Sequence, residues 1–512
     1  MDTRKQWRIL LFSFLFYGGI FAQQLQALTP QWRPVYHFTP LKNWTNDPNG
    51  LIYLDGVYHM YNQQNPFENK WGHMSWGHAT SLDLVHWKHL PIAMPETIDK
   101  DTTWRFSGCA VWDKKNTSGF CKKGGCLVAV YTADQPNLKK ESQFIAYSND
   151  RGITYTNYVH NPVIDLHMKD FRDPNVSWNE QLQKWLMVVA LPSEHKVRFY
   201  ASGNLKEWDL LSEFGNAGYR QAGWECPSLI ELPVNGKPGE HKWVLVVSAA
   251  GPKRGTFMQY FVGDFNGKSF NNDSPSDTVL TVDYGDSYYA AIPWNGQPGT
   301  EKIMIGWMVP GRQATVPWTG QMSIPRDLSL QQTKNGYRLI QVPASVVETN
   351  LDNLSEHKMI KKTGLSIENS EQVLMNLPGN AYWLDAEIII RSGEQAGFKI
   401  AQKKDSQGKS LNETVIAWNA VDRQGYIDKS LSGNSSVNRT SLLKTDFLER
   451  EDSVIRIQIL FDKSSLEVFF GNGEKSLTTY IYPDADANSI SFFAKGSAEI
   501  KNLTLWDLSG IK

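Results

Sequence analysis

The 512-residue sequence predicts an all-β protein, a five-bladed β-propeller followed by a C-terminal β-sandwich. Three observations lead to this fold class. Short apolar runs alternate with turn-forming clusters, and the periodicity of amphipathic helices is nearly absent. A unit of four such runs recurs five times up to about residue 345, which is typical of propeller blades. After that point the repeat ends and a second set of strand-like runs begins.

Residues 1–22 have the pattern of a secretory signal peptide. Three basic residues, Arg4, Lys5 and Arg8, precede the 13-residue apolar run 9–21, which is followed by a small residue, Ala22. The apolar run is short for a membrane-spanning helix. We therefore expect a secreted or periplasmic protein without stable membrane insertion after cleavage. An uncleaved anchor is the alternative.

The five repeats lie within residues 33–345. Each opens with a strand, turns into a second strand, and continues into a third that ends in another turn. The repeats start at Asp47, Gly108, Asp173, Glu225 and Tyr289, at intervals of 52 to 65 residues. In a propeller the innermost strand of every blade lies beside the central axis. Side chains at these starts should therefore converge in one funnel-shaped pocket.

The remainder of the chain predicts a second domain. Residues 346–357 are polar, and we expect them to form a linker. Between 358 and 512 the runs alternate apolar and polar residues and are separated by Asn-Gly and Ser-Gly turns, which favours an antiparallel β-sandwich. Nothing in this part has the spacing of catalytic residues.

Composition narrows the functional classes. Lysine and arginine number 52 and aspartate and glutamate 53, so the net charge of −1 offers no electrostatic footprint for nucleic acid. The histidines fit no zinc-binding spacing, and we expect neither a metal ion nor a cofactor. The oligomeric state has no signature in the sequence. The 19 Trp and 20 Tyr mostly fill cores, but such rings also offer flat faces on which sugars stack.

The four cysteines divide into two groups. Cys121 and Cys126 bracket a hairpin-like tip, and in an exported protein we expect them to form a disulfide. Cys109 and Cys226 stand in apolar runs and are expected to be small buried residues.

Three carboxylates occupy the same position in different repeats. Asp47 opens the first repeat, Asp173 the third and Glu225 the fourth. Taken alone, residues 46–50 (NDPNG) are ordinary turn chemistry, and Arg172 beside Asp173 has the pattern of a surface ion pair. A fold selected for stability alone would avoid three acids in one pocket, so their recurrence indicates a functional site. Two carboxylates facing an aromatic pocket are the apparatus of glycoside hydrolysis.

The same residues carry a family resemblance. Residues 44–50, WTNDPNG, resemble the WMNDPNG box of glycoside hydrolase family 32, which contains invertases, inulinases and levanases. Matching motifs follow in that family's order at 63–66 (QQNP), 71–72 (WG), 106–108 (FSG), 172–174 (RDP), 224–227 (WECP), 288–290 (YYA), 323–326 (SIPR) and 464–469 (SSLEVF). The chain departs from the family at Thr45, where methionine is usual, and at Asn62 and Gln64, where the family places aromatic residues on both sides of Gln63.

The resemblance implies a role for each residue. Asp47 would attack C2 of a fructosyl unit, Glu225 would act as general acid and then general base, and Asp173 would bind fructose hydroxyls and stabilise the transition state. The residues expected to shape the fructose pocket are Asn46, Gln63, Trp71, Phe106, Ser107, Arg172 and Trp307.

The resemblance also implies an activity. We expect a secreted, retaining β-fructosidase that removes terminal fructosyl units from fructans (levan or inulin) and from sucrose. A narrow funnel walled by aromatic-bearing loops favours exo action. Two alternatives remain at this point, a fructosyltransferase with the same catalytic residues and a fructan-binding propeller without catalysis.

Overall fold

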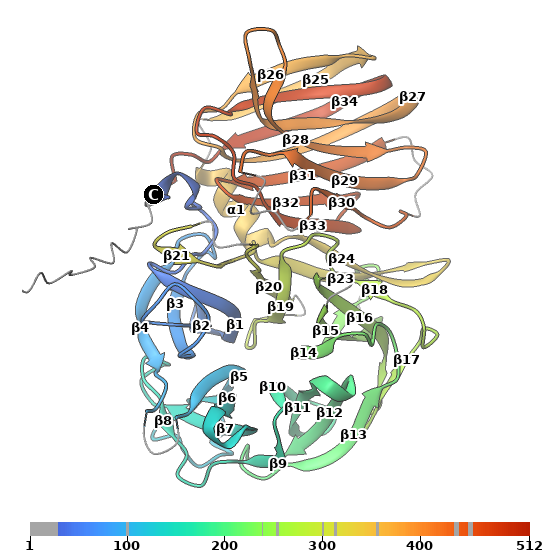
Figure 1. Ribbon diagram of the computed structural model, residues 1–512. Helices are drawn as coiled ribbons and strands as arrows, with labels where there is room; N and C mark the ends of the chain where they lie inside the picture. Colours follow the sequence, from blue (N-terminus) through green and yellow to red (C-terminus); the bar gives the residue numbers. More distant parts are fainter. Residues whose placement is uncertain are drawn as a thin grey trace, which may run out of the picture.

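The computed structural model describes residues 29–98, 102–237, 239–251, 255–299, 302–311, 315–354, 358–434, 440–448 and 454–511. The expected signal peptide, residues 1–22, lies outside them. The predicted fold class is confirmed, since five separate sheets surround one axis and a larger sheet structure lies beside them (Figure 1). No helix in the described ranges has the length and apolar character needed to cross a membrane.

Each blade is an antiparallel sheet whose first strand is innermost (Figure 1). Blade 1 contains β1 (Asn43–Leu54), β2 (Val57–Gln64), β3 (Ser75–Ser81) and β4 (Lys88–Met94), and β21 (Trp318–Thr319) joins β1 in parallel. Blade 2 contains β5 (Trp104–Asp113), β6 (Cys126–Gln135), β7 (Lys140–Ser148), β8 (Thr156–Asn157) and β9 (Ile164–Met168). Blade 3 contains β10 (Arg172–Asn179), β11 (Lys184–Leu191), β12 (Lys196–Ser202) and β13 (Asp209–Gly215). Blade 4 contains β14 (Gly223–Pro233), β15 (His241–Gly251), β16 (Gly255–Phe265), β17 (Phe270–Asn272) and β18 (Leu280–Thr281). Blade 5 contains β19 (Tyr288–Pro293), β20 (Ile303–Met308), β22 (Gln321–Met322), β23 (Arg326–Thr333) and β24 (Gly336–Pro343).

Apolar side chains between neighbouring blades hold the ring together. Three short 3₁₀ turns complete the described propeller, at Pro30–Trp32, Pro136–Leu138 and Pro192–Glu194.

The predicted disulfide between Cys121 and Cys126 is present at the start of β6, and Cys109 and Cys226 are buried free thiols.

The C-terminal domain is a single ten-stranded ladder that folds over on itself. Its strands are β25 (Met359–Glu368), β26 (Glu371–Asn376), β27 (Ala381–Lys404), β28 (Ser410–Asn419), β29 (Gln424–Leu431), β30 (Leu442–Lys444), β31 (Val454–Asp462), β32 (Ser465–Phe470), β33 (Lys475–Tyr480) and β34 (Ser489–Asp507). The first part of β27 pairs with β31 and its last part with β28, while β34 follows β27 along nearly its whole length. The two long strands therefore run through both halves of the sandwich and enclose its apolar core.

The expected polar linker at 346–357 is helical over most of its length. Helix α1 spans Ser345–Leu354. Val347 and Leu351, four residues apart on one face, are buried in a cluster that also contains propeller and sandwich residues. Leu354 continues the same spacing, but apolar positions are few in this polar segment, and the composition therefore predicted a linker.

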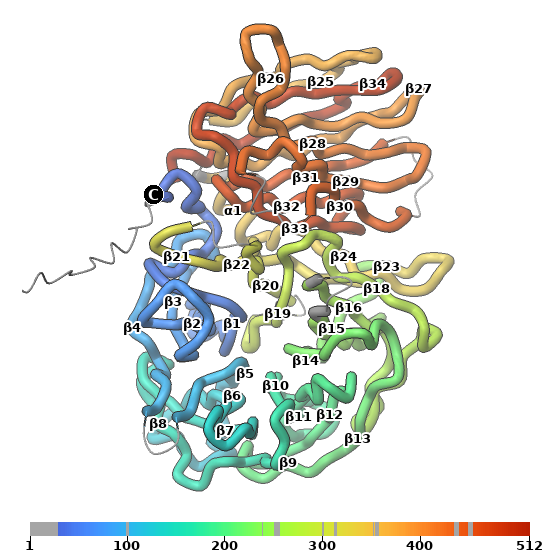
Figure 2. Tube along the Cα trace, viewed as in Figure 1, coloured from blue at the N-terminus to red at the C-terminus, as the bar shows by residue number. Residues whose placement is uncertain are grey.

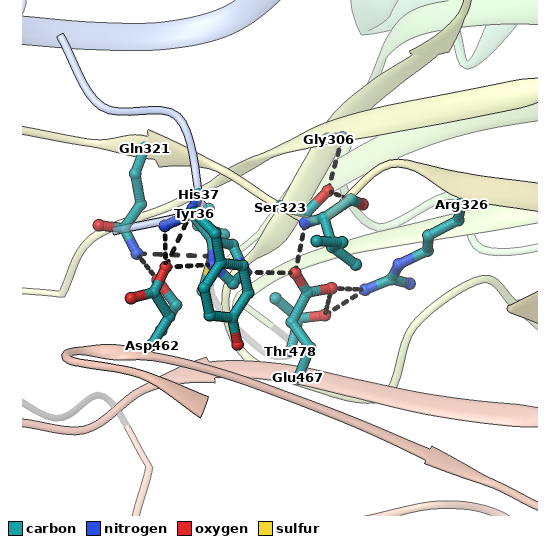
Figure 3. A network of polar contacts seen from close by, with 12 residues as sticks. Tyr36, His37, Gly306, Gln321, Ser323, Arg326, Asp462, Glu467 and Thr478 are labelled. Carbon is teal, nitrogen blue, oxygen red and sulfur yellow. Dashed lines mark hydrogen bonds and ion pairs between the residues drawn. The ribbon is translucent and has the colours of Figure 1, made fainter. Parts of the chain in front are cut away.

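Buried charges cross the boundary between the two domains (Figure 3). His37, from the segment before β1, lies 2.9 Å from Asp462 Oδ2 through Nδ1 and 3.0 Å from Glu467 Oε1 through Nε2. On its other side Glu467 is paired with Arg326 of β23, which also lies 3.0 Å from Asp283 Oδ2. These side chains are all buried. Because an unpaired buried charge is costly, the network fixes how the propeller meets the sandwich.

Candidate active site

The five inner strands β1, β5, β10, β14 and β19 surround the axis of the propeller (Figure 2). Side chains from these strands and the segments beside them line a cavity of about 380 Å³. All ten residues singled out from the sequence border it: Asn46, Asp47, Gln63, Trp71, Phe106, Ser107, Arg172, Asp173, Glu225 and Trp307. Four further residues complete the lining: Asp134, Glu141, Lys169 and Tyr289. Each blade contributes to the cavity, as the position of the repeat starts predicts.

The inner strands share an irregularity at the cavity. In every blade the pairing register between the first and second strand shifts at the point where the site residues lie. In blade 1 the shift falls between Thr45 and Pro48, and so includes Asp47; in blade 3 it includes Asp173, whose φ is +66°. A β-bulge bends a strand and re-aims its side chains, and it is common beside active sites. The bulges thus turn consecutive side chains toward the axis.

Asp47 is a half-buried carboxylate held by polar contacts. Ser107 Oγ donates to Oδ2 at 2.6 Å, and Asn46 Nδ2 donates to Oδ1 at 3.2 Å. Burial raises the pKa of Asp47, and the nearby charge of Glu225 acts in the same direction, while the hydrogen bonds from Ser107 and Asn46 oppose the rise. Burial prevails, so the pKa of Asp47 is raised overall, while the two donors hold its carboxylate in place.

Glu225 is held by a cation and a phenol. Arg172 Nη1 donates to Oε1 at 2.9 Å, and Tyr289 OH donates to Oε2 at 2.5 Å. The side chain of Glu225 is 30% exposed, so it keeps access to the cavity. Burial, followed by the charge of Glu225, raises the pKa of Tyr289 well above its ordinary value, so the phenol stays protonated and remains a donor. Glu225 lies between the buried residues Trp224 and Cys226, where a carboxylate needs a partner, and these two donors provide it.

Arg172 connects several acids in the cavity wall. Its Nε and Nη2 donate to the two oxygens of Glu141 at 2.9 and 2.7 Å, and Nη2 also donates to Asp170 at 2.7 Å. Burial lowers the pKa of this guanidinium, but the hydrogen bonds and charge of Glu141 and the charge of Glu225 more than offset it and raise the pKa. A permanent cation therefore balances part of the negative charge that the site gathers.

Asp173 lies at the bottom of the acidic cluster. Its Oδ2 accepts from the backbone N–H of Cys226 at 3.0 Å, and its own N–H donates to Thr132 Oγ1 at 2.9 Å. Burial and the charge of Glu225 raise the pKa of Asp173 well above its ordinary value, although Arg172 opposes this. Cys226 Sγ lies 3.5 Å from Asp173 and 3.6 Å from Asp47, so this buried thiol packs directly behind two residues of the cavity lining.

Aromatic side chains form the rim of the cavity. Trp71 is 51% exposed and makes edge-to-face contacts with Trp104 and Phe106. Trp307 meets Tyr289 at a ring-centroid distance of 6.5 Å. The buried Nε1 of Trp307 has no hydrogen-bond partner among the described residues. These rings provide apolar faces beside charged groups, a combination that suits a sugar.

The departures from the family box lie next to each other in space. Asn62 Nδ2 donates to Thr45 Oγ1 at 2.8 Å, and that hydroxyl donates to the carbonyl oxygen of Gln63 at 3.0 Å. Gln63 in turn donates through Nε2 to the carbonyl oxygen of Arg105 at 2.7 Å. Thr45 and Asn62 thus form a buried polar pair next to Asp47, at positions where the family places methionine and an aromatic residue.

Sequence reasoning assigned no site role to four of the lining residues. The position of Tyr289 in the pocket could have been predicted, since this residue starts the fifth repeat. Asp134 and Glu141 face each other across β6 and β7, away from the repeat starts, and nothing in their spacing marks them. Lys169 precedes β10 and carries no motif. Among the described residues, no group of three or more histidine, cysteine, aspartate and glutamate side chains is arranged to hold a metal ion.

The geometry fits acid–base chemistry on a sugar. Both carboxylates are half-buried, but Asp47 is held by the neutral donors Ser107 and Asn46, whereas Glu225 is held by the cation Arg172 and the phenol of Tyr289. Two carboxyl groups in different environments within one pocket are what glycoside hydrolysis requires.

Comparison with known proteins agrees with this geometry. The model of the glycosyl hydrolases family 32 N-terminal domain matches residues 37–343, and that of the family 32 C-terminal domain matches residues 350–507. A levanase of Bacillus subtilis (strain 168) is 40% identical over 497 residues, covering 94% of this chain and 71% of the levanase. An extracellular exo-inulinase of Aspergillus niger is 36% identical over 504 residues, covering 91% of this chain and 92% of that enzyme. The crystal structure of an exo-inulinase from Aspergillus awamori superposes with a TM-score of 0.86 at 33% identity, covering 93% and 98% of the two chains.

Proposed function

Because the chain belongs to glycosyl hydrolase family 32 and is a glycoside hydrolase of the β-fructofuranosidase type, we propose that it is an exo-acting, retaining enzyme that releases terminal fructosyl units from levan or inulin and from sucrose. The observation that carries the proposal is the pairing of Asp47 and Glu225 in one axial pocket, each held by its own set of donors. The relatives, a levanase and exo-inulinases, support the choice of substrates.

In the first step Asp47 attacks C2 of the terminal fructosyl unit. Ser107 and Asn46 hold the attacking carboxylate, so little reorientation precedes bond formation. Glu225 donates its proton to the glycosidic oxygen as the bond to C2 breaks, and the shortened chain or glucose leaves. The product of this step is a fructosyl ester of Asp47.

In the second step Glu225, now ionised, takes a proton from water, which attacks C2 and frees Asp47. Arg172 and Tyr289 both donate to Glu225, so the side chain keeps its position in both protonation states. Asp173 borders the same pocket, and in its ionised form it would stabilise the oxocarbenium-like transition states of both steps.

The form of the pocket supports exo action. At the opposite end of the axis Asn295 donates to the carbonyl oxygens of Ala110 and Val176, which belong to the inner strands of two other blades, so the axis is obstructed there. A pocket of about 380 Å³ that is rimmed by Trp71 and Phe106 accommodates a chain end rather than the middle of a polymer.

The proposal is tested by a time course on levan, inulin and sucrose, followed by chromatography. Free fructose from the earliest samples supports exo hydrolysis, whereas an early ladder of oligosaccharides contradicts it. Growth of longer oligosaccharides at high sucrose would instead identify a fructosyltransferase. Release of no sugar from any substrate would favour the alternative of a fructan-binding protein.

Export is proposed from residues 1–22 and from the extracellular relatives. N-terminal sequencing of protein from the culture medium or periplasm tests it.

A further inference from the structure

The propeller face opposite the catalytic pocket carries aromatic side chains at the far ends of inner strands. Strands β1, β5 and β10 end at or beside Tyr53, Trp112 and Trp178, and Trp294 directly follows β19. Five residues separate Asp173 in the catalytic pocket from Trp178, which at ~3.3 Å per residue places the two ends about 16 Å apart. A molecule bound at this far face therefore does not contact the catalytic carboxylates.

Among the cavities on this face, Trp178 borders two. The smaller, of about 170 Å³, is also lined by Trp112, Trp185 and Thr117. Trp185 stands edge-to-face against Trp178 at 5.2 Å, and its indole N–H donates to Thr117 Oγ1 at 2.9 Å. The wall of this cavity is therefore fixed by buried contacts, while Trp178 and Trp112 remain half-exposed in it.

The larger cavity, of about 240 Å³, combines aromatic and polar side chains. Trp178 and Trp243 line it together with Asn295 and Lys302. Asn295 uses its amide N–H groups on two backbone carbonyls, and its Oδ1 receives no hydrogen bond from the described residues. Lys302 is half-buried, burial lowers its pKa, and it has no ion pair with a described residue. An acceptor and a donor are thus left for a ligand.

The tryptophans of this face differ in how their indole N–H groups are used. Buried Trp185 and Trp294 donate to neighbouring oxygens at 2.9 and 3.1 Å. Half-buried Trp112, Trp178 and Trp243 line the cavities, and their indole N–H groups make no hydrogen bond to a described residue. Since tryptophan N–H groups usually find a partner when packed, the second group is suited to an external acceptor.

Charges around the cavities are balanced. Glu180 borders the smaller cavity together with Lys115, and Glu231 borders the larger one together with Lys302. Neither sign dominates, so the face does not favour an anion or a cation. Flat apolar rings combined with scattered donors and acceptors match a neutral polyhydroxylated ligand, whose C–H faces cover the rings and whose hydroxyls meet the polar groups.

We propose that this face is a second binding site, which holds a distant segment of the fructan chain through Trp178 and the two cavities beside it. The choice of fructan as ligand rests on the proposed function. Binding here keeps the polymer on the enzyme between cleavage events. A chain held at this face presents its end to the catalytic pocket at a high effective concentration. The site should therefore affect long chains and leave sucrose, which reaches only the catalytic pocket, unaffected.

The test separates binding from hydrolysis. In an Asp47→Asn background, which cannot consume the polymer, Trp178→Ala and Trp243→Ala are added separately and binding is measured by affinity electrophoresis in gels containing levan or inulin. Trp208→Ala is the matched control, because Trp208 is also half-buried, packs on the same core cluster as Trp178 and lines neither cavity.

We expect Trp178→Ala and Trp243→Ala each to weaken polymer binding at least about fivefold, and Trp208→Ala to leave it unchanged. In the active background all three should hydrolyse sucrose with parental kcat/KM, which also shows that they fold. If Trp178→Ala does not fold, Trp243→Ala decides. Unchanged polymer binding in the cavity variants that fold would overturn the second site. Failure of the wild-type enzyme to hydrolyse sucrose or fructan would overturn only the proposed function, because the binding result does not depend on turnover.

Discussion

Replacing His37 with glutamine should remove a pH-dependent part of the stability. Burial alone would lower the pKa of His37, but its hydrogen bonds to Asp462 and Glu467 outweigh burial and raise the pKa to about 9. Two other charged groups join this network: Arg326 pairs with Glu467, and Asp283 pairs with Arg326. An imidazole that titrates near 9 when folded and at its ordinary 6.5 when unfolded stabilises the fold by about 3 kcal/mol.

The sign follows from the direction of the shift. The stabilisation is fully present below pH 6.5, declines above it, and is lost as pH rises through 9. Urea unfolding at several values between pH 6.5 and 9.5 should therefore show wild type losing about 3 kcal/mol more than His37→Gln. Cys226, whose pKa is also raised by burial, adds an alkaline loss common to both proteins, so the difference isolates His37.

The control is His86→Gln, which removes a histidine–carboxylate pair of similar length, 2.7 Å to Asp83, at an exposed site. Solvent screens such pairs, so this variant should follow the wild-type pH dependence. If His37→Gln loses stability with pH as steeply as wild type does, the reasoning about the buried charge network is refuted.

Three further outcomes follow from the site and the disulfide. Glu225→Ala should lower kcat/KM on sucrose by about 10²–10⁴-fold and recover partly on a fructoside with a good leaving group, whereas Asp47→Ala should not recover; equal behaviour of the two would contradict their assigned roles. Ser107→Ala removes a 2.6 Å hydrogen bond that stabilises the Asp47 carboxylate, so the acid limb of the kcat/KM profile should move to higher pH, and an unmoved limb would argue against this contact. Cys121→Ser opens a short disulfide loop and should cost about 2 kcal/mol in urea unfolding without changing sucrose turnover; unchanged stability would mean that the bridge adds nothing.

The repeat made the pocket predictable. Asp47, Asp173 and Glu225 start their units, and a propeller brings equivalent positions of all blades to one axis, so their convergence follows from spacing alone. The pocket positions of Ser107 and Arg172 could be predicted as well, because each residue directly precedes a repeat start. Prediction from position was reliable here because one geometric rule governs every blade.

Other features depend on contacts that sequence does not encode locally. The bulges around Asp47 and Asp173 interrupt strand pairing without a distinctive residue pattern. Glu141 reaches the site from a middle strand, and His37 meets its acids from more than 400 residues away in the chain. Helix α1 was not predicted within the polar linker because tertiary packing of Leu351, and not a strong periodic pattern, holds it.

The central claim, a double displacement through Asp47, is tested most directly by turning over sucrose in water containing methanol and identifying the methyl fructoside by NMR. Methanol intercepts the fructosyl ester from the face that glucose left, so the account predicts methyl β-D-fructofuranoside, formed alongside free fructose and absent with Asp47→Ala. Formation of the α-anomer would show inversion and would contradict a covalent intermediate on Asp47.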